Sequence, residues 1–260
     1  MALTALITGA SGGIGYELAR LFAKDHHNLV LVARNGGKLA HVGDEIQRQF
    51  GVAVTTLARD LTAASAPQSL FDQMQQAGIT VDILVNNAGY GKHGMFAALA
   101  MEDCLGQIQL NITALTQLAK LFLPPMLERK SGRILNIAST AGFQAGPTMA
   151  VYYATKAYVI SFSEALANEI RGSGVSVTCH CPGATDTGFQ KRAETEESIL
   201  FKKLRPMDAK AVARHAYRSL MAGKTLAIAG MGNWLLTESQ RLAPRRLVVA
   251  ISRKLLDQVG

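Results

Sequence analysis

The sequence predicts an α/β protein with a doubly wound, seven-stranded parallel sheet and helices on both faces. Short apolar runs rich in β-branched residues recur along the chain, and longer segments of helical periodicity separate them. This alternation favours parallel strands, because right-handed crossovers place the connecting helices on the two faces of one sheet. The 260 residues, 48% hydrophobic and 18% charged, supply enough apolar material for one large core.

Each element follows from its local pattern. The segments with the composition of buried strands are residues 3–8, 28–33, 52–57, 82–85, 133–138, 175–179 and 225–229. The segments with clear helical periodicity are residues 14–24, 37–50, 101–128, 151–171 and 208–222. We expect ligands at the carboxyl ends of the strands, because the connecting loops of a doubly wound sheet gather there.

Composition excludes several classes of protein. No stretch reaches the roughly 18 consecutive apolar residues of a membrane-spanning helix, and the N-terminal segment lacks the features of a signal peptide. The three cysteines, Cys104, Cys179 and Cys181, do not make a complete disulfide set, and none has the spacing of a zinc site. We therefore expect a cytoplasmic protein that binds no metal.

The basic charge is concentrated near the end of the sequence. The net charge is +8, and residues 191–260 hold 14 basic and 6 acidic side chains, whereas residues 1–190 hold 13 of each. This block could face phosphates, an anionic substrate or a membrane surface, or form a solvated basic surface. A nucleic-acid partner is not expected, because the block has one tryptophan and no recognised binding motif.

A glycine-rich turn follows the first predicted strand and leads directly into a helix. Residues 8–15 read Thr-Gly-Ala-Ser-Gly-Gly-Ile-Gly. Gly9 would permit the sharp turn, Gly13 would let backbone approach a pyrophosphate, and Gly15 would let helix and strand pack closely. Because a helix N-terminus favours phosphate charge, the turn predicts a dinucleotide ligand and a Rossmann-type fold.

The end of the second strand indicates which dinucleotide binds. An acidic residue here would accept a hydrogen bond from a ribose 2′-hydroxyl, but the sequence has Ala33-Arg34-Asn35. The guanidinium of Arg34, helped by Lys38, would instead attract a 2′-phosphate. NADP(H) is therefore expected in preference to NAD(H).

Polar or small residues follow two further strands. Asp60 can accept a hydrogen bond from an adenine amino group, and it precedes Leu61. In the run 86–89, which reads Asn-Asn-Ala-Gly, the small residues would let backbone approach the adenosine ribose. Each of these residues could also serve only as a loop cap.

Tyr152 and Lys156 lie four residues apart at the start of a predicted helix, so their side chains share one face. A nearby ammonium, together with the positive charge of a bound nicotinamide, would lower the pKa of Tyr152 towards that of a general acid–base catalyst. Ser139, at the end of the fifth strand, could hydrogen-bond the same substrate oxygen. Tyr153 has no lysine at this spacing, so Tyr152 is the predicted catalytic residue.

Six motifs, in order along residues 3–229, resemble those of the short-chain dehydrogenase/reductase family. They are the turn at residues 8–15, the Asn-Asn-Ala-Gly run at 86–89, Asn111 in Leu-Asn-Ile, Ser139 in Asn-Ile-Ala-Ser, Tyr152 with Lys156, and Pro182-Gly183 followed by Thr187. The pattern departs from the family at position 12, where NADP-preferring relatives often have a basic residue and this chain has glycine. It departs again after Gly230, where a long basic segment follows.

The resemblance implies a catalytic tetrad of Asn111, Ser139, Tyr152 and Lys156. Tyr152 would donate the proton in reduction and Ser139 would polarise the carbonyl. Lys156 would bind the nicotinamide ribose and lower the tyrosine pKa, and Asn111 would support a water-linked proton path. The expected cofactor-binding residues are Gly9, Ser11, Gly13, Ile14, Gly15, Arg34, Asp60, Leu61, Asn87, Ala88, Gly89, Ile137, Tyr152, Lys156, Pro182, Gly183 and Thr187.

These observations predict an NADPH-dependent carbonyl reductase, reversible as an alcohol dehydrogenase, that acts on a small or lipophilic substrate. The alternative is a regulatory protein that senses NADP(H) without turnover and docks on a partner through its basic tail. An intact tetrad argues against this alternative, because a sensor has little chemical need for it.

Residues 1–230 are expected to form the dinucleotide-binding catalytic domain, with short helices or a mobile substrate flap at about residues 188–206. Residues 231–260 would be a basic, amphipathic extension of that domain. Its apolar side comprises Leu247, Val248, Ala250, Ile251, Leu255 and Val259. Such a helix suits a contact in a homo-oligomer, either a dimer or a tetramer, a lid over the pocket, or a peripheral contact with an anionic membrane.

Overall fold

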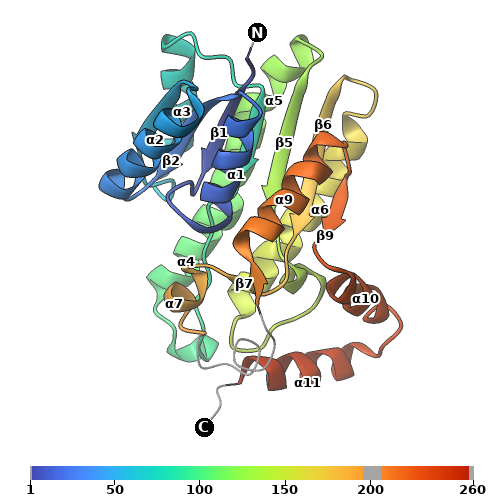
Figure 1. Cartoon of the computed structure of the whole chain (residues 1–260). Helices are drawn as coiled ribbons and strands as arrows, with labels where there is room; N and C mark the ends of the chain where they lie inside the picture. Colours follow the sequence, from blue (N-terminus) through green and yellow to red (C-terminus); the bar gives the residue numbers. More distant parts are fainter. Residues whose placement is uncertain (1, 196–205, 258–260) are drawn as a thin grey trace.

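Seven parallel strands form the central sheet of the computed structural model, which describes residues 2–195 and 206–257 (Figure 1). Every strand predicted from the sequence belongs to this sheet, so the predicted fold class is confirmed. In chain order the strands are β1 (Thr4–Thr8), β2 (Asn28–Ala33), β3 (Val54–Ala58), β4 (Ile83–Asn86), β5 (Gly132–Ile137), β6 (Val175–Cys181) and β9 (Leu226–Ile228).

The strand order, β3-β2-β1-β4-β5-β6-β9, places β1 at the centre of the sheet. β1 pairs in parallel with β2 on one side and with β4 on the other. The chain therefore winds outward from β1 in both directions, and the loops after β1 and β4 diverge at a crevice. Ligands of doubly wound sheets bind at this crevice.

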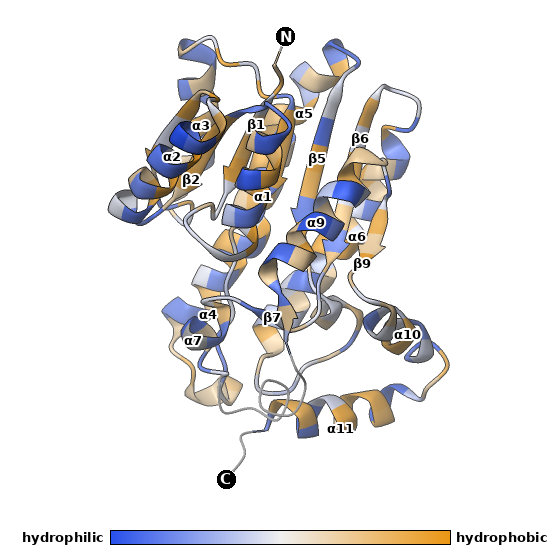
Figure 2. Ribbon diagram, in the orientation of Figure 1, coloured by the Kyte–Doolittle hydropathy of each residue, from blue (hydrophilic) through white to orange (hydrophobic). Residues whose placement is uncertain are grey.

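Helices cover both faces of the sheet, so the central strands β1, β2 and β4 are apolar on both sides (Figure 2). Neighbouring residues on one strand enter different cores, as Leu6 and Ile7 do. The first face carries α1 (Gly13–Lys24), α2 (Gly36–Phe50) and α9 (Ala209–Met221). The opposite face carries α3 (Ala66–Gln76), α5 (Leu115–Glu128) and α6 (Ala150–Glu169).

The predicted helix at residues 101–128 is not continuous. It consists of α4 (Met101–Ile108), a π-helical turn (Gln109–Ala114) and α5. A π-helical turn takes one residue more per turn than an α-helix and is often found at functional sites. Asn111 lies in this turn.

Several elements were not predicted from the sequence. These are α3, two short 3₁₀ turns (Phe96–Ala98 and Thr140–Phe143), the small parallel pair β7 (Thr185–Asp186) and β8 (Met207–Asp208), and α10 (Met231–Ser239). α7 (Phe189–Ala193) is a short helix of the kind expected in the segment 188–206. α11 (Arg245–Leu256) is the helix expected in the basic extension. The predicted flap at residues 188–206 begins with α7, and residues 196–205 lie outside the described part of the chain. Across residues 2–195 and 206–257, no helix is long and apolar enough to span a bilayer.

A buried histidine pair joins the sheet to α9. The Nε2 atom of His180, on β6, lies 3.0 Å from Nδ1 of His215. His180 is fully buried, and burial lowers its pKa to about 3, with the neighbouring His215 acting in the same direction. The folded protein therefore holds His180 neutral at a pH where a histidine in an unfolded chain, with a pKa near 6.5, takes up a proton.

We predict that the free energy of unfolding falls as the pH drops below about 6.5, because the unfolded state binds a proton on His180 that the folded state does not. The slope from this residue approaches about 1.4 kcal/mol per pH unit. Urea unfolding at several pH values should give a shallower slope for His180→Asn than for the wild type. His41→Asn, on the exposed side of α2, is the matched control and should keep the wild-type slope. Parallel curves for all three proteins would contradict the prediction.

Candidate active site

A cavity of about 700 Å³ lies at the carboxyl ends of the strands. Its volume falls within the range of small-molecule and cofactor pockets, about 300–1,000 Å³. All predicted catalytic and cofactor-binding residues line it except Gly15 and Asn111. The structure therefore brings together motifs that are widely separated in the sequence.

The glycine-rich turn leaves β1 in a conformation that favours glycine. Gly9 has a φ angle of 68°, and a Cβ atom there would lie 2.8 Å from the side-chain nitrogen of Asn87. A Cβ atom on Gly15 would lie 2.4 Å from the carbonyl oxygen of Gly9. This close packing brings the N-terminus of α1, with its unpaired N–H groups, to the edge of the cavity, where it can bind phosphate.

Hydrogen bonds hold the loops after β1 and β4 together. Thr8 Oγ1 donates to the carbonyl oxygen of Val85 (3.1 Å) and accepts from the backbone N–H groups of Asn87 and Ala88 (3.0 Å each). The side-chain amide of Asn87 donates to the carbonyl oxygens of Thr8 (2.9 Å) and Gly9 (3.2 Å). Asn87 therefore fixes the shape of the glycine-rich turn from across the crevice.

Asn111 lies behind the cavity, fully buried. Its side-chain oxygen accepts from the backbone N–H of Tyr90 (3.1 Å), and its amide donates to the Tyr90 carbonyl (2.9 Å) and to Thr155 Oγ1 (3.0 Å). Both amide hydrogens are bonded within the protein, so the side chain ties the loop after β4 to α6. The water-linked proton path that the resemblance implies would have to use the main chain of Asn111.

Ser139, Tyr152 and Lys156 meet in the cavity. Ser139 follows β5, and its hydroxyl accepts from the Ala141 N–H (3.1 Å) at the start of a 3₁₀ turn. α6 presents Tyr152 and Lys156 on one face, and the Lys156 ammonium lies 5.8 Å from the centre of the Tyr152 ring. That ammonium donates to the Ile137 carbonyl over 2.8 Å, which fixes it beside the end of β5.

Burial dominates the electrostatics of these groups. It raises the pKa of Tyr152, and a hydrogen bond with Ser139 opposes the rise. It lowers the pKa of Lys156 to about 8, although the thiols of Cys179 and Cys181 act in the opposite direction. Lys156 is therefore still mostly protonated near pH 7 and can donate hydrogen bonds inside the cavity. The lowering of the Tyr152 pKa by Lys156 stays a prediction for the complex with cofactor.

Positive charge gathers at the end of the cavity beside β2. Arg34 follows β2 directly, and both Arg34 and Lys38 line the cavity. Asn35 begins α2 by accepting a hydrogen bond from the backbone N–H of Lys38 (2.9 Å). A Cβ atom on Gly12 would lie 3.3 Å from Lys38 Nζ, so this ammonium lies against the glycine-rich turn.

Asp60 is the acidic group at this end. Burial alone would raise its pKa, but hydrogen bonds from Thr62 and the charges of Arg34 and Arg192 lower it. Asp60 Oδ1 accepts from both the N–H and the hydroxyl of Thr62. The other oxygen of this ionised carboxylate can accept from an adenine amino group.

Arg192 is a cavity residue that the sequence did not single out. It comes from α7, and its guanidinium carbon lies 4.4 Å from the centre of the Tyr90 ring. α7 therefore packs beside Tyr90 in the loop after β4, and the charge of Arg192 helps to lower the pKa of Asp60. The sequence of this segment shows only a mixture of acidic and basic residues. Such a mixture does not indicate which part of the molecule a short helix packs against.

Residues of α10 and α11 were also missed. Leu236, Ser252, Leu255 and Leu256 line the cavity, and Leu256 packs in one cluster with Tyr152 and Tyr153. The available signal was the amphipathic pattern of the last segment, for which a pocket lid was one of three predicted roles. The pattern could not show which part of the molecule the helix contacts.

Comparison with known proteins agrees with this geometry. A family model described as short chain dehydrogenase matches residues 3–198. Ketoacyl reductase HetN of Nostoc sp. is 37% identical over 187 residues, which cover 72% of this chain and 65% of that protein. The 3-oxoacyl-[acyl-carrier-protein] reductase FabG of Chlamydia trachomatis is 30% identical over 192 residues, which cover 72% of this chain and 76% of that one.

Solved structures share the fold along almost the whole chain. A short-chain dehydrogenase from Sphingobium yanoikuyae in complex with NADPH is 32% identical, with a TM-score of 0.83 and coverage of 92% of this chain and 94% of that one. A bulky-bulky ketone specific alcohol dehydrogenase from Comamonas testosteroni is 29% identical, with a TM-score of 0.79 and coverage of 92% of both chains. The chain belongs to the short-chain dehydrogenase family of oxidoreductases, as its motifs predicted.

We predict that Gly15→Ala destabilises the fold and weakens dinucleotide binding, because the new methyl group meets the Gly9 carbonyl at 2.4 Å. The free energy of unfolding should fall by about 1–3 kcal/mol, the usual cost of overpacking. Helix propensity alone would predict the opposite, since alanine favours helices over glycine by about 1 kcal/mol. Urea unfolding and titration with NADPH measure the two effects.

Gly37→Ala is the matched control. Gly37 is also near the start of a helix, but its Cβ atom would lie 3.8 Å from the nearest atom, Asn35 Oδ1. This variant should be as stable as the wild type or more stable. If Gly15→Ala behaved in the same way, the packing of the turn would not have the role assigned here.

Proposed function

We propose that the protein is an NADPH-dependent carbonyl reductase, reversible as an alcohol dehydrogenase, with Tyr152 as the general acid. The observation that carries the proposal is one cavity with two chemically different ends. Ser139, Tyr152 and Lys156 lie at one end, and the glycine-rich turn with Arg34 lies at the other. This arrangement fits an extended dinucleotide whose nicotinamide reaches Tyr152.

In the proposed reduction, the carbonyl oxygen of the substrate accepts hydrogen bonds from Ser139 and Tyr152. Bound NADPH supplies the hydride that reaches the carbonyl carbon. Tyr152 gives its hydroxyl proton to the oxygen as negative charge develops there, and the Lys156 ammonium stabilises the resulting phenolate. Holding the reacting groups in line accounts for much of the rate gain in such reactions.

Tyr152 is favoured over Tyr153, although both line the cavity. Tyr152 has Ser139 as a hydrogen-bond partner and the Lys156 ammonium near its ring. Burial raises the pKa of Tyr153, and its polar neighbours are Ser252 and Gln144 rather than a cation. The regulatory alternative gains no support from this site, because a cofactor sensor does not need the three groups together.

The preference for NADPH is supported by charge. A 2′-phosphate beside Arg34 would also find the Lys38 ammonium, which lies against Gly12. Lys38 thus brings a cation close to position 12, where NADP-preferring relatives often have a basic residue. The relative from Sphingobium yanoikuyae has NADPH bound, whereas a similar short-chain dehydrogenase from Burkholderia phymatum, 25% identical with a TM-score of 0.81, has NAD bound.

The proposed substrate is a lipophilic ketone or an acyl ketone. Met149, Phe189 and Leu256 pack in one cluster with Tyr152 and offer apolar contacts at this end of the cavity. The names of ketoacyl, oxoacyl and bulky-ketone enzymes among its relatives agree with this class. A cytoplasmic location and a homo-oligomeric state stay predictions.

Tyr152→Phe should abolish carbonyl-dependent oxidation of NADPH while leaving NADPH binding nearly intact, because it removes the acid and keeps the ring. We expect a loss in kcat of about 10²- to 10⁴-fold, the usual contribution of a general acid. Steady-state assay with a panel of lipophilic ketones measures kcat, and fluorescence titration measures binding. Tyr153→Phe is the matched control and should retain most of the activity. Retention of more than about a tenth of kcat by Tyr152→Phe would refute the role of Tyr152.

Arg34→Ala should remove most of the preference for NADPH over NADH by weakening only the phosphorylated cofactor. A charge-assisted contact contributes about 1.5–3 kcal/mol, which is roughly 10- to 150-fold in affinity. Arg48→Ala, on the exposed last turn of α2, is the control for a general change in charge. Equal affinities of the wild type for the two cofactors would overturn the NADPH assignment.

A further inference from the structure

α11 has one buried side and one exposed apolar side. Its inner side is buried at Ser252 and Leu256 and forms part of the cavity wall. On its outer side, Leu247 and Ile251 are 52% and 50% exposed. The inner side contacts the catalytic domain, whereas the outer side has no partner among the described residues.

Exposed apolar residues continue along α10 and the turn to α11. Among the described residues, seven of the fourteen exposed large hydrophobic side chains lie between positions 231 and 251. Leu242 is 91% exposed and Met231 is 80% exposed. Leu236 also lines the cavity, and we call the other six residues the C-terminal apolar surface: Met231, Trp234, Leu235, Leu242, Leu247 and Ile251.

Basic side chains accompany this surface. Residues 231–257 contain five arginine or lysine residues and two acidic residues. Glu238 pairs with Arg241 (3.1 Å) and Asp257 pairs with Arg253 (2.7 Å). Within the described chain this leaves Arg245, Arg246 and Lys254 without an ion pair, and all three are exposed.

We infer that the C-terminal apolar surface, with its basic side chains, binds the surface of an anionic lipid bilayer. Apolar residues flanked by cations match such a surface, where acyl chains lie beneath anionic headgroups. A second copy of the chain is a poorer match, because a two-fold interface would cover the three cations with the same basic surface, in which both acidic residues of the described part, Glu238 and Asp257, are already paired. The cavity lies on the inner side of α11, so the outer side offers no pocket from it. A bilayer surface does not require a pocket.

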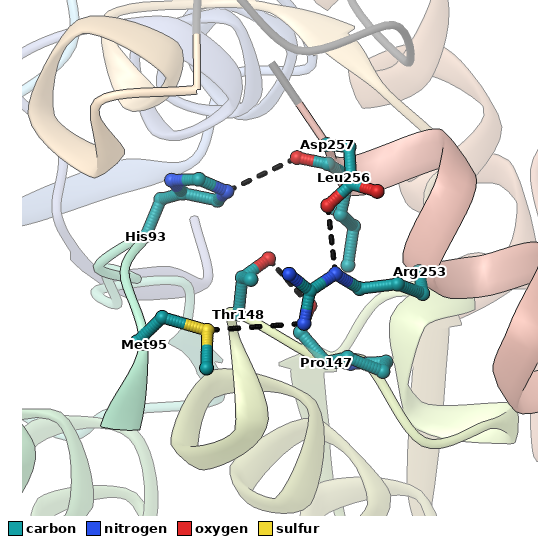
Figure 3. Close-up of polar contacts among 7 residues, drawn as sticks. All are labelled: His93, Met95, Pro147, Thr148, Arg253, Leu256 and Asp257. Carbon is teal, nitrogen blue, oxygen red and sulfur yellow. Dashed lines mark hydrogen bonds and ion pairs between the residues drawn. The ribbon is translucent and has the colours of Figure 1, made fainter. Parts of the chain in front are cut away.

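Contacts at the C-terminal end of α11 hold the helix so that its outer side remains exposed (Figure 3). His93 Nε2 lies 3.0 Å from the Leu256 carbonyl oxygen. The Arg253 guanidinium lies 3.8 Å from the Met95 sulfur and also contacts Asp257. Figure 1 shows α10 and α11 at the lower edge of the molecule, away from the sheet. α11 therefore lies at the periphery of the molecule.

Vesicle binding tests this inference directly, because Trp234 is the single tryptophan of the chain and lies within the surface. Full-length protein should co-sediment with phosphatidylcholine vesicles that contain phosphatidylserine, and the Trp234 emission should shift to the blue. High salt should release the protein, and vesicles of phosphatidylcholine alone should bind it much more weakly.

Two pairs of double variants distinguish the contribution of electrostatic attraction to vesicle binding from that of apolar insertion. Arg245→Glu with Arg246→Glu should lower the partition into anionic vesicles by about fivefold or more for each residue. Its matched control reverses Lys210 and Arg214, two exposed cations on α9, and should bind as the wild type does. Leu242→Ser with Leu247→Ser should reduce the blue shift, whereas Met101→Ser with Leu105→Ser, on the exposed side of α4, should not.

The inference would be overturned if binding did not depend on anionic lipid, or if the α9 and α10–α11 variants behaved alike. It would also be overturned if the Leu242→Ser, Leu247→Ser variant lowered the oligomer mass in analytical ultracentrifugation without any vesicle binding by the wild type. A second copy of the chain would then cover the surface. None of these measurements requires turnover, so Tyr152→Phe should bind vesicles as the wild type does even if the proposed reaction is wrong.

Discussion

The site depends on the hydrogen bonds made by the hydroxyl group of Thr8. This hydroxyl group lies at the end of the central strand, donates to the strand on one side of the crevice and accepts from two successive N–H groups of the loop beyond it. In the opposite direction, the side-chain amide of Asn87, in that loop, donates hydrogen bonds to the carbonyl oxygens of Thr8 and Gly9. The glycine-rich turn and the loop after β4 are thereby one rigid unit, although 77 or more residues separate them in the sequence.

Most of the fold could be predicted because buried parallel strands are distinctive. Both faces of the sheet are covered, so the central strands β1, β2 and β4 are almost unbroken apolar runs of the kind that local composition detects. α3 was missed although Leu70 and Met74 keep the spacing of one helix face, because an 11-residue segment with few apolar residues gives only a short signal. The break between α4 and α5 was missed because a π-helical turn shifts the apolar pattern by only one residue and has no residue signature of its own.

The site residues that could be predicted are those whose spacing along the sequence indicates their role. Tyr152 and Lys156 share a helix face because they are four residues apart, and the glycine-rich turn marks a strand-to-helix junction. Arg192 and Leu256 carry no such signal, since they enter the cavity only through long-range packing. The position of Asn111 behind the cavity, with both amide hydrogens bonded, likewise depends on Tyr90 and Thr155, which local patterns do not bring together.

α11 lies between the cavity and the outside of the molecule. A single helix, about 10 Å across, forms part of the cavity wall with one side and the molecular surface with the other. A ligand that displaced this helix from within would change the affinity of the outer side for whatever binds it. Thermodynamic reciprocity then requires an occupant of the outer side to change the affinity for that ligand by the same factor. The two sides of α11 would thus form an allosteric pair that shares one structural element.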